Sequence, residues 1–495
     1  MSKQKYSIFA LILYLLMKIN QYFITNDVNV SFEIADFNLN SIDDYKIFSH
    51  NNLKVNCFEF EENEIIILGD IYDSFNAGCS IGDIGHVLVK SRTLGDLLQM
   101  LDKYTGRFVV FSKLNNTHHI VSDFFCQRQV FYRFNEDKFY ASSSDKLLLD
   151  SLHLELEVDD KKKHLRTSNY FLKIHEHWFL DNTDWDHRFN KLLPNHFLNI
   201  NKSEVLRIPI YASLLSDKKT FEKEFLAVLK NSIEAYSNRY KLMLGLTSGY
   251  DSRLLMASSF TLKNLIKYFT FSRKDTYVKR DVAIAKKLSD RYGLDYSEII
   301  VNDLSKEFKS EFESQFLVPR ILDKTKNIQW FKNQALEKTA NISGFGGELI
   351  RGFYHEENFK NIESICKTIE YELNQSNKDA IDSWLESART YVDKNNLLIS
   401  DLFYLEVRLG KWGNKMVHEM DFASVEEFTP YNNRYLLFSL LLNYNADERK
   451  TIILNLLEQS LEGITDIPIN PKTWKDTVKR IIFYKYYKKW IQKIK

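Results

Sequence analysis

The chain has 495 residues, about three times the roughly 150 residues expected of one domain, so a peptide-sized scaffold is excluded and two or three domains are expected. Hydrophobic residues make up 44% of the chain and charged residues 27%, which is typical of folded proteins and excludes wholesale disorder. The net charge of +1 excludes bulk electrostatic attraction to a polyanion, and we expect no nucleic-acid partner.

The chain starts with an apolar run. Residues 8–17 follow Lys3 and Lys5, an order found in secretory signals. The run has about half of the roughly 20 residues that span a bilayer, and residues 18–21 offer no small-residue cleavage site. We favour a buried first strand or helix, with a signal or membrane anchor as the alternative.

The first part of the chain is expected to be rich in β-strands. Short apolar and aromatic runs separated by turns occur at residues 64–68, 108–111, 119–121, 129–134 and 138–141. From about residue 221 the pattern changes. Helical periodicity is broken there by apolar runs at 241–246 and 266–271, which predicts a parallel sheet with crossover helices. Residues 203–215 form the candidate junction. We therefore divide the chain into domains 1–210 and 211–495, with mainly helical structure after about residue 361.

Cysteine and histidine offer no sign of a metal site. The four cysteines show no CxxC pair or other metal-ligand spacing and are too few for a disulfide framework, so we expect reduced thiols and a cytoplasmic location; they are Cys57, Cys79, Cys126 and Cys366. His175 and His177 are two residues apart, so they lack the i, i+4 spacing that places two histidines on one helix face. The pair His118 and His119 is equally uninformative.

One segment carries the clearest chemical signal. An apolar strand at 242–246 runs into a small, hydroxyl-rich turn, and a helix is expected to start near Asp251. This arrangement places backbone N–H groups and the positive end of a helix dipole where a phosphate is favoured. The spacing and lysine of a Walker A loop are missing, and an ordinary capped turn is the alternative. Thr247, Ser248 and Ser252 offer hydroxyl donors, and Asp251 is a candidate Mg²⁺ ligand.

Residues 247–252 resemble the PP-loop signature SGGxDS of the asparagine synthetase family, with Thr247 and Ser248 in place of the first Ser and the first Gly. Further segments resemble other marks of the family over most of residues 221–480; they are 281–285 with 292–294, 342–354, 411–421, 428–434 and 467–472. The resemblance includes β-lactam synthetases and lasso-peptide cyclases, and it implies an α/β PP-loop domain of the adenine nucleotide alpha hydrolase-like type with extra helices.

The resemblance also implies ATP and Mg²⁺ as cofactors. The nucleotide-binding residues predicted on this basis are Leu246, Thr247, Ser248, Gly249, Tyr250, Asp251, Ser252, Phe271, Ser343 and Gly344. Asp251 and Glu348 are the predicted metal ligands, although Glu348 replaces the family's aspartate. Lys472 is aligned with the lysine that neutralises charge on the α-phosphate and the departing pyrophosphate, and Lys475 is the alternative.

The first half resembles the family's glutaminase-like domain, an α+β fold of the Ntn β-sandwich type, at residues 102–108, 123–132 and 140–147. Glutamine-hydrolysing members carry a Cys directly after the initiator Met, whereas Ser2 stands there in this chain. A serine alkoxide is much harder to generate than a thiolate, so we expect no glutamine hydrolysis.

These observations predict an ATP-dependent carbon–nitrogen ligase. It would activate a carboxylate substrate as an acyl-adenylate and transfer the acyl group to ammonia or to a substrate amine. Phe345 stands where asparagine synthetase has a Glu and β-lactam-forming relatives have a Tyr. A phenylalanine there argues against asparagine and against a β-lactam as the product. A non-catalytic interaction or regulatory protein on a degenerate scaffold is the second hypothesis, and another PP-loop enzyme, such as a tRNA-thiolating or NAD-forming one, is the third.

The end of the chain predicts a basic amphipathic helix. Residues 474–495 interleave lysines with aromatic and apolar side chains. We favour a terminal helix that is docked by its apolar face, with contact to an anionic membrane as the alternative.

Overall fold

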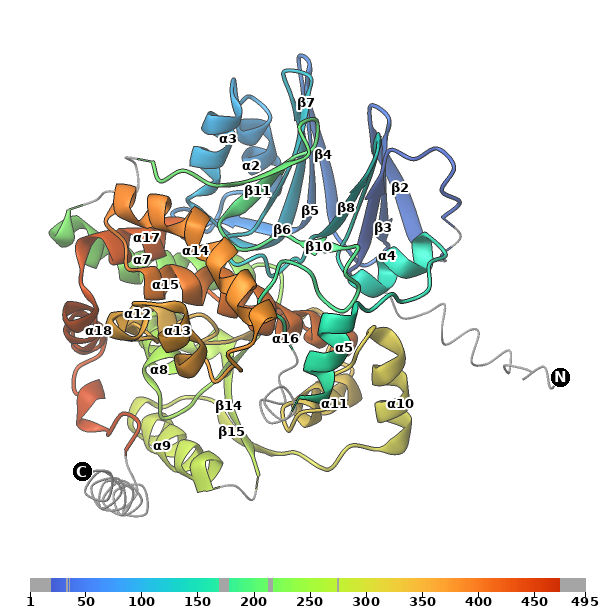
Figure 1. Ribbon diagram of the computed structural model, residues 1–495. Coiled ribbons are helices and arrows are strands. Elements are labelled where there is room, and N and C mark those ends of the chain that lie inside the picture. The colour runs from blue at the N-terminus through green and yellow to red at the C-terminus, as the bar shows by residue number, and fades with distance from the viewer. Residues whose placement is uncertain are drawn as a thin grey trace.

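The computed structural model describes residues 19–32, 34, 36–168, 178–211, 217–273 and 276–471. We call residues 19–211 the first half and residues 217–471 the second half. Two antiparallel sheets build the first half and one parallel sheet the second (Figure 1). The expectation for residues 8–17 and that of the basic terminal helix lie outside the described residues. Within the described ranges, we find no helix with the length and apolar character needed to cross a bilayer.

Each antiparallel sheet of the first half has six strands. The order in one sheet is β10 (Asn190–Lys191), β8 (Phe131–Asn135), β9 (Lys138–Ser142), β1 (Tyr22–Thr25), β3 (Tyr45–His50) and β2 (Phe37–Ile42). The order in the other is β12 (Glu204–Arg207), β11 (His196–Asn199), β7 (Thr117–Ser122), β6 (Tyr104–Leu114), β5 (Asn63–Asp73) and β4 (Val55–Phe60). The β-rich first half is therefore confirmed, whereas its assignment to the Ntn type stays a prediction.

The continuous apolar run in β5 shows why these sheets are covered on both faces. Successive strand residues point to opposite faces. Ile66 and Leu68 pack in the core between the two sheets, while Ile65 and Ile67 pack under α2 (Ile81–Leu88) and α3 (Leu94–Leu101). The outer face of the other sheet is covered by α4 (Asp145–Ser151). The first half is thus a sandwich of two sheets with helices outside.

The second half contains a five-stranded sheet whose neighbouring strands are all parallel. Its order is β15 (Tyr296–Ile300), β14 (Ile266–Ser272), β13 (Lys241–Gly245), β16 (Thr339–Ile342) and β17 (Glu426–Phe428). Apolar clusters cover both faces. One face packs against α7 (Lys218–Ser237), α8 (Tyr250–Ser258) and α9 (Thr276–Tyr292), and the other against α10 (Lys306–Gln315) and α11 (Thr325–Gln334). The prediction of a parallel sheet with crossover helices is confirmed.

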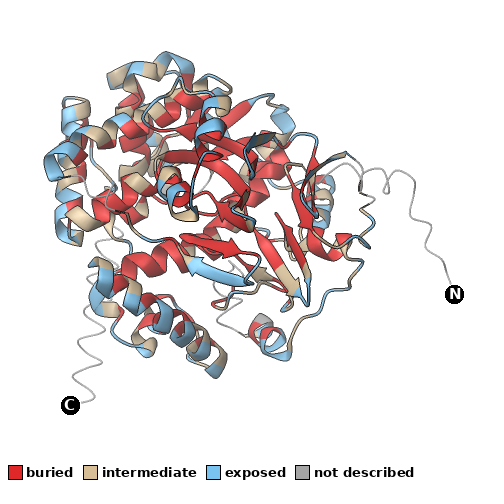
Figure 2. Cartoon of the chain, turned by 90° about the horizontal axis from the view of Figure 1, so that it is seen from above, coloured by how far each residue is buried: buried red, intermediate tan, exposed pale blue. Residues whose placement is uncertain are grey.

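The described part of the chain after β16 is mainly helical, which agrees with the expectation for residues after about 361. The helices are α12 (Glu348–Arg351), α13 (Ile362–Thr368), α14 (Gln375–Asn395), α15 (Ile399–Phe403), the π-helix η4 (Tyr404–Gly413), α16 (Asn414–Met420), α17 (Arg434–Asn443) and α18 (Ala446–Ser460). Short 3₁₀ turns are η2 (Phe260–Leu265), η3 (Glu356–Asn358), η5 (Asp421–Ala423) and η6 (Ile464–Asp466). Seen from above, the strands are largely buried, and the exposed residues lie on the outer faces of the helices (Figure 2).

A buried ionic cluster joins the two halves. Arg107 of β6 donates from both terminal nitrogens to the carboxylate of Asp421, at 3.1 and 3.0 Å, and lies 3.5 Å from Glu426 of β17. Arg128 lies 3.8 Å from each of the same two carboxylates. All four side chains are at most 6% exposed. Charges buried this deeply are tolerated only when they are paired, so the cluster fixes how the halves dock.

Asn432 adds a polar contact beside this cluster. Its amide donates to the carbonyl of Gly106 at 2.7 Å and to Asp123 at 2.8 Å, and its side-chain oxygen accepts from the N–H of Phe125 at 2.8 Å. The stretch 428–434 that the sequence singled out is therefore a docking segment against the first half.

Replacing Arg107 with Leu leaves Asp421 and Glu426 short of a buried partner. We expect the free energy of unfolding to fall by about 3–5 kcal/mol in urea titrations, because breaking a buried pair leaves charge uncompensated. Lys218→Ala, which removes an exposed pair with Glu448, is the matched control and is expected to cost less than about 1 kcal/mol. A similar small loss for both variants would contradict the docking role of the cluster.

Candidate functional site

The turn after β13 has the geometry of an anion-binding loop. The backbone of Leu246 is satisfied within the sheet: its N–H donates to Phe269 at 2.8 Å, and its carbonyl accepts from the Thr270 hydroxyl at 2.6 Å. The chain then leaves the sheet, and α8 begins at Tyr250 after Gly249, with no side-chain cap. The first N–H groups of a helix have no partner within the helix, and the helix dipole is positive at that end. The start of α8 is therefore suited to a phosphate.

Hydroxyl groups hold the turn in shape. Ser252 accepts from the N–H of Thr247 at 3.1 Å, and its hydroxyl lies 2.9 Å from that of Thr247. The Thr247 hydroxyl in turn accepts from the N–H of Gly249 at 3.2 Å. These bonds explain why small hydroxyl residues occupy the positions that the sequence singled out.

A second glycine-rich turn meets the first. It follows β16, the neighbour of β13, and contains Gly344 and Gly347. A Cβ added to Gly344 would lie 2.9 Å from the Cβ of Asp251, and one added to Gly347 would lie 2.8 Å from it. Only glycine allows this approach. The contact confirms that the two segments lie together, as the resemblance implied.

The meeting point is the topological switch of the sheet. From β13 the chain adds β14 and β15 on one side and then returns to add β16 and β17 on the other. Ligands of open parallel sheets bind at the carboxyl ends of the strands where the order reverses. Both glycine-rich turns lie at that position, between β13 and β16.

Asp251, a predicted metal ligand, is paired with an arginine. Arg351 donates from Nε to Oδ1 at 3.1 Å and from Nη2 to Oδ2 at 2.9 Å. Burial raises the pKa of Asp251 to about 6, which Arg351 opposes and Glu348 reinforces. Glu348 accepts a hydrogen bond of 2.9 Å from the Tyr404 hydroxyl.

The carboxylate oxygens in this arrangement are not placed to bind a magnesium ion. Mg²⁺ needs free oxygen ligands at about 2.0–2.1 Å in octahedral geometry, whereas Arg351 covers both oxygens of Asp251. Across the described part of the chain, no group of three or more His, Cys, Asp or Glu side chains is arranged to hold a metal. We therefore derive no chemical step through a metal at Asp251 and Glu348.

Ser248 is also paired within the protein. The carboxylate of Asp281 on α9 accepts from its N–H at 3.0 Å and from its hydroxyl at 2.5 Å. The N–H of Asn470 donates to the Ser248 carbonyl at 2.9 Å. The structure therefore brings the segments around residues 281 and 470 to the turn.

Arg253, which the sequence did not single out, holds the last described segment at the site. Its guanidinium donates to the carbonyls of Ile464, Ile467 and Pro468, at 3.0, 2.5 and 3.0 Å. Arg253 is fully buried on α8. The sequence offered little signal for Arg253, which stands directly after Asp251 and Ser252 at the start of the apolar stretch 254–257.

Two other predicted nucleotide-binding residues, Phe271 and Ser343, have partners within the protein. Phe271 packs edge-to-face against Trp330 and Phe331, on the α10–α11 side of the sheet. The N–H of Ser343 donates to the carbonyl of Phe428 at 2.8 Å. Ser2, His175, His177, Lys472 and Lys475 lie outside the described residues, so their roles stay predictions.

Phe345 is enclosed by aromatic groups at the boundary of the two halves. Its ring lies 6.2 Å from that of Phe125, in an edge contact, and 6.3 Å from the stacked ring of Trp412. Neither neighbour is a proton donor of the kind expected in a proton-handling pair. Phe345 therefore serves packing.

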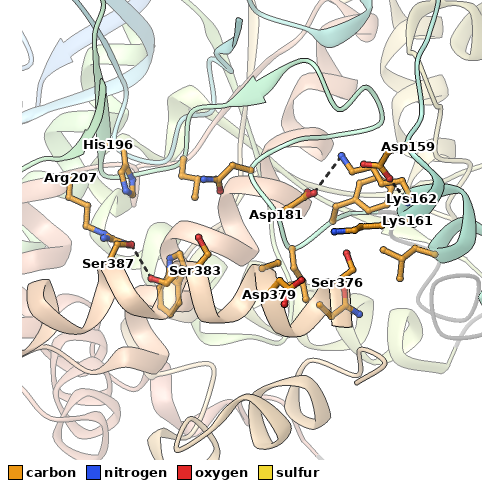
Figure 3. Close-up of a pocket in the computed structure, with 18 residues that line it drawn as sticks. Asp159, Lys161, Lys162, Asp181, His196, Arg207, Ser376, Asp379, Ser383 and Ser387 are labelled. Atoms are coloured by element: carbon orange, nitrogen blue, oxygen red, sulfur yellow. Dashed lines mark hydrogen bonds and ion pairs between the residues drawn. The ribbon is translucent and has the colours of Figure 1, made fainter. Parts of the chain in front are cut away.

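A cavity of about 500 Å³ lies away from both glycine-rich turns, and none of its lining residues belongs to them. Residues of α14 form one wall, and α5 (Asp160–Thr167) with the segment 179–182 forms another (Figure 3). Its charged and titratable lining residues are Asp159, Lys161, Lys162, Asp181, His196, Arg207 and Asp379. Arg207 is neutralised by Glu406 at 2.9 Å, and Lys162 lies 3.7 Å from Asp181. The charges are largely compensated within the protein.

No protein-family model and no curated protein matches the sequence. Among solved structures, the glutamine-dependent NAD⁺ synthetase of Acinetobacter baumannii is similar over 42% of this chain at 13% identity and a TM-score of 0.20, and the chain spans only 47% of that protein.

Two further solved structures match at the same TM-score of 0.20. The NH₃-dependent NAD synthetase of Campylobacter jejuni is 15% identical over 36% of this chain and 78% of its own. The NMN synthetase of Francisella tularensis is 12% identical over 51% of this chain and 95% of its own. Likeness at this level supports no conclusion about fold or activity, which therefore depend on the geometry above.

Lys411 of η4 is a buried lysine. Burial lowers the pKa of Lys411 to about 7, Asp181 opposes the shift, and Lys191 and Lys162 reinforce it. Between about pH 7 and the ordinary lysine pKa of about 10.4, the unfolded chain binds more protons than the folded one, so stability rises with pH. We expect Lys411→Met to be more stable than the parent at pH 7, by about 1–3 kcal/mol.

The gain of Lys411→Met is expected to shrink toward pH 10, because Lys411 is neutral in the folded chain there and the unfolded chain approaches the ordinary lysine pKa of about 10.4. Denaturant melts at pH 7, 8.5 and 10 measure it, and Lys202→Met on the surface is the control. A stability difference that is constant across this range would show that Lys411 is not buried as a neutral amine.

Proposed function

We propose that the chain is an ATP-dependent ligase that forms an amide bond and releases AMP and pyrophosphate. The observation that carries the proposal is the meeting of two glycine-rich turns at the switch point of a parallel sheet, beside the uncapped start of α8. A triphosphate is the ligand that this arrangement suits best, because backbone N–H groups and the helix dipole converge there.

The reaction follows from binding a nucleotide at this place. A carboxylate oxygen attacks the α-phosphorus of ATP, the bond to the β-phosphate oxygen breaks, and pyrophosphate leaves. An amine then attacks the acyl carbon of the adenylate, AMP leaves, and a proton is released. The chain's share is to position the groups and to neutralise charge, for which we propose the start of α8, the hydroxyls of Thr247 and Ser252, and Lys472 or Lys475.

The source of the amine is a separate part of the proposal. We propose that the first half, divided from the second near residue 210, is a glutaminase-like sandwich without its nucleophile. Free ammonia or an amine on a substrate would then be the acceptor. The apolar packing of Phe345 against Phe125 and Trp412 supports a product other than asparagine or a β-lactam. A cytoplasmic location remains part of the proposal.

Two observations favour the alternative of a non-catalytic protein on the same scaffold. Asp281 takes the N–H of Ser248, and Arg351 takes both oxygens of Asp251, so two groups expected to serve ATP are satisfied within the chain. A regulatory protein would keep this arrangement when nucleotide is added.

Pyrophosphate exchange separates the two. Purified protein is incubated with ATP, labelled pyrophosphate and pools of carboxylic acids, with and without divalent ions. An added Cβ at Gly249 meets no atom closer than 3.4 Å, so Gly249→Ala is compatible with folding but crowds the place of the phosphates. We expect acid-dependent label in ATP and at least a roughly tenfold loss in this variant, because backbone approach to the pyrophosphate requires glycine.

Gly82→Ala on α2 is the matched control, since its added Cβ also meets ordinary contacts, the nearest at 3.6 Å. Exchange in this variant is expected to equal that of the parent. Absence of acid-dependent label with every pool, or label that Gly249→Ala leaves unchanged, would refute adenylation at this site. Comparing glutamine with ammonium as nitrogen donors tests the expectation that a chain with Ser2 in place of the family's Cys does not hydrolyse glutamine.

A further inference from the structure

Asp251 forms an ion pair with Arg351, a residue that was not among the predicted site residues. Asp251 lies in the first turn of α8, and Arg351 is the last residue of α12 before Gly352, whose φ of +69° ends that helix. Both oxygens of the carboxylate are engaged, at 3.1 and 2.9 Å. The parallel, two-bond geometry is the strongest that arginine forms with a carboxylate.

Asp251 has little freedom to turn away from this pair. Gly344 and Gly347 lie against it so closely that an added Cβ on either would approach its side chain to within 3.0 Å. The Tyr431 hydroxyl donates to its backbone carbonyl at 2.9 Å. The neighbouring carboxylate, Glu348, is held by Tyr404. A divalent ion entering here would have to displace a guanidinium from a carboxylate that is fixed on several sides.

Arg351 keeps donors for a further anion. A guanidinium has five N–H groups, and two of them serve Asp251. Its side chain is 28% exposed, and the guanidinium carbon lies 5.6 Å from the centre of the Tyr250 ring, at the start of α8. Among the described residues the other N–H groups of Arg351 have no hydrogen-bond partner, so they are available beside the helix end at which a phosphate is favoured.

We infer that Arg351 takes the place of a metal ion at Asp251, so that this chain binds the phosphates of a nucleoside triphosphate through a guanidinium and without a divalent cation at that position. The inference rests on the proposed function for the identity of the ligand. It differs from that function in assigning the cation, and it makes Asp251 a positioning residue for Arg351.

The first test measures binding of Mn²⁺ without nucleotide, and electron paramagnetic resonance reports the concentration of the free ion. We expect the full-length parent protein to leave millimolar Mn²⁺ free. Arg351→Met has a side chain of similar length without charge, and it is expected to gain a Mn²⁺ site because the oxygens of Asp251 are then open. Arg351→Met combined with Asp251→Asn should lose that site again. Arg291→Met, which breaks an exposed pair with Asp466, is the control and should bind no Mn²⁺.

The second test is equilibrium binding of ATP in EDTA and in Mg²⁺. We expect the dissociation constant of the parent to change less than about threefold between the two conditions, and Arg351→Met to bind at least about tenfold more weakly in EDTA. Arg351→Lys should fall between the two, because one ammonium does not match the two-oxygen geometry. Circular dichroism and thermal melting confirm that each variant is folded.

The outcomes separate the two proposals. Mn²⁺ binding by the parent that Asp251→Asn abolishes, or ATP binding that requires Mg²⁺ and is unaffected by Arg351→Met, overturns the role of Arg351 and leaves the ligase intact. Absence of ATP binding under both conditions overturns the proposed function and with it the phosphate role of Arg351. The Mn²⁺ measurement still decides whether Arg351 or a metal neutralises Asp251.

Discussion

Two buried arginines determine how this protein is assembled. Arg107 and Arg128 belong to the first half, and the carboxylates that compensate them, Asp421 and Glu426, belong to the second. Burial by itself opposes ionisation of Asp421, but Arg107, with contributions from His418 and Arg128, holds its pKa well below the ordinary range. Neither half can leave the other without exposing or orphaning these charges. The halves are therefore expected to behave as one unit.

The same contacts reach the candidate site. Glu426 lies on β17, which pairs with β16, and the turn with Gly344 and Gly347 follows β16. The Thr429 hydroxyl donates to the carbonyl of Phe345 at 2.8 Å, and the ring of Phe125 lies against Gly346. The first half thus shapes the second glycine-rich turn, even though it supplies none of the predicted nucleotide-binding residues. The sandwich of the first half therefore has a structural role at the candidate site.

Much of the fold could be predicted from the sequence, for reasons that depend on particular residues. The runs 241–246 and 266–271 are mainly apolar because most residues of β13 and β14 are buried, with Lys241 and Lys267 as exposed exceptions, and such runs are easy to recognise. The first-half strands β1, β2, β3, β4, β10, β11 and β12 were missed. Of these, β2, β4 and β12 are partly exposed and carry polar residues, and the others are short, with six residues or fewer. The turn at 247–252 could be recognised because its hydroxyl residues and glycine shape the turn through contacts within the same short segment.

The parts of the site that the sequence could not reveal are those made by distant residues. Arg351 reaches Asp251 across 100 positions, and Arg107 reaches Asp421 across 314. A single arginine in a sequence is most often a solvated surface residue, and only the folded chain shows that both are paired and that Arg107 is buried. The magnesium pair of Asp251 and Glu348 stays a prediction. The sequence did not show that Arg351, at the other end of α12 from Glu348, competes with a metal for Asp251.

The central claim is that a triphosphate binds at the switch point of the parallel sheet. A crystal structure of the full-length protein with a non-hydrolysable ATP analogue, grown in EDTA, tests it most directly. The account predicts the triphosphate at the start of α8, with phosphate oxygens within hydrogen-bond distance of the turn and of Arg351. A nucleotide seated in the cavity beside α14, or none at saturating concentration, would contradict it.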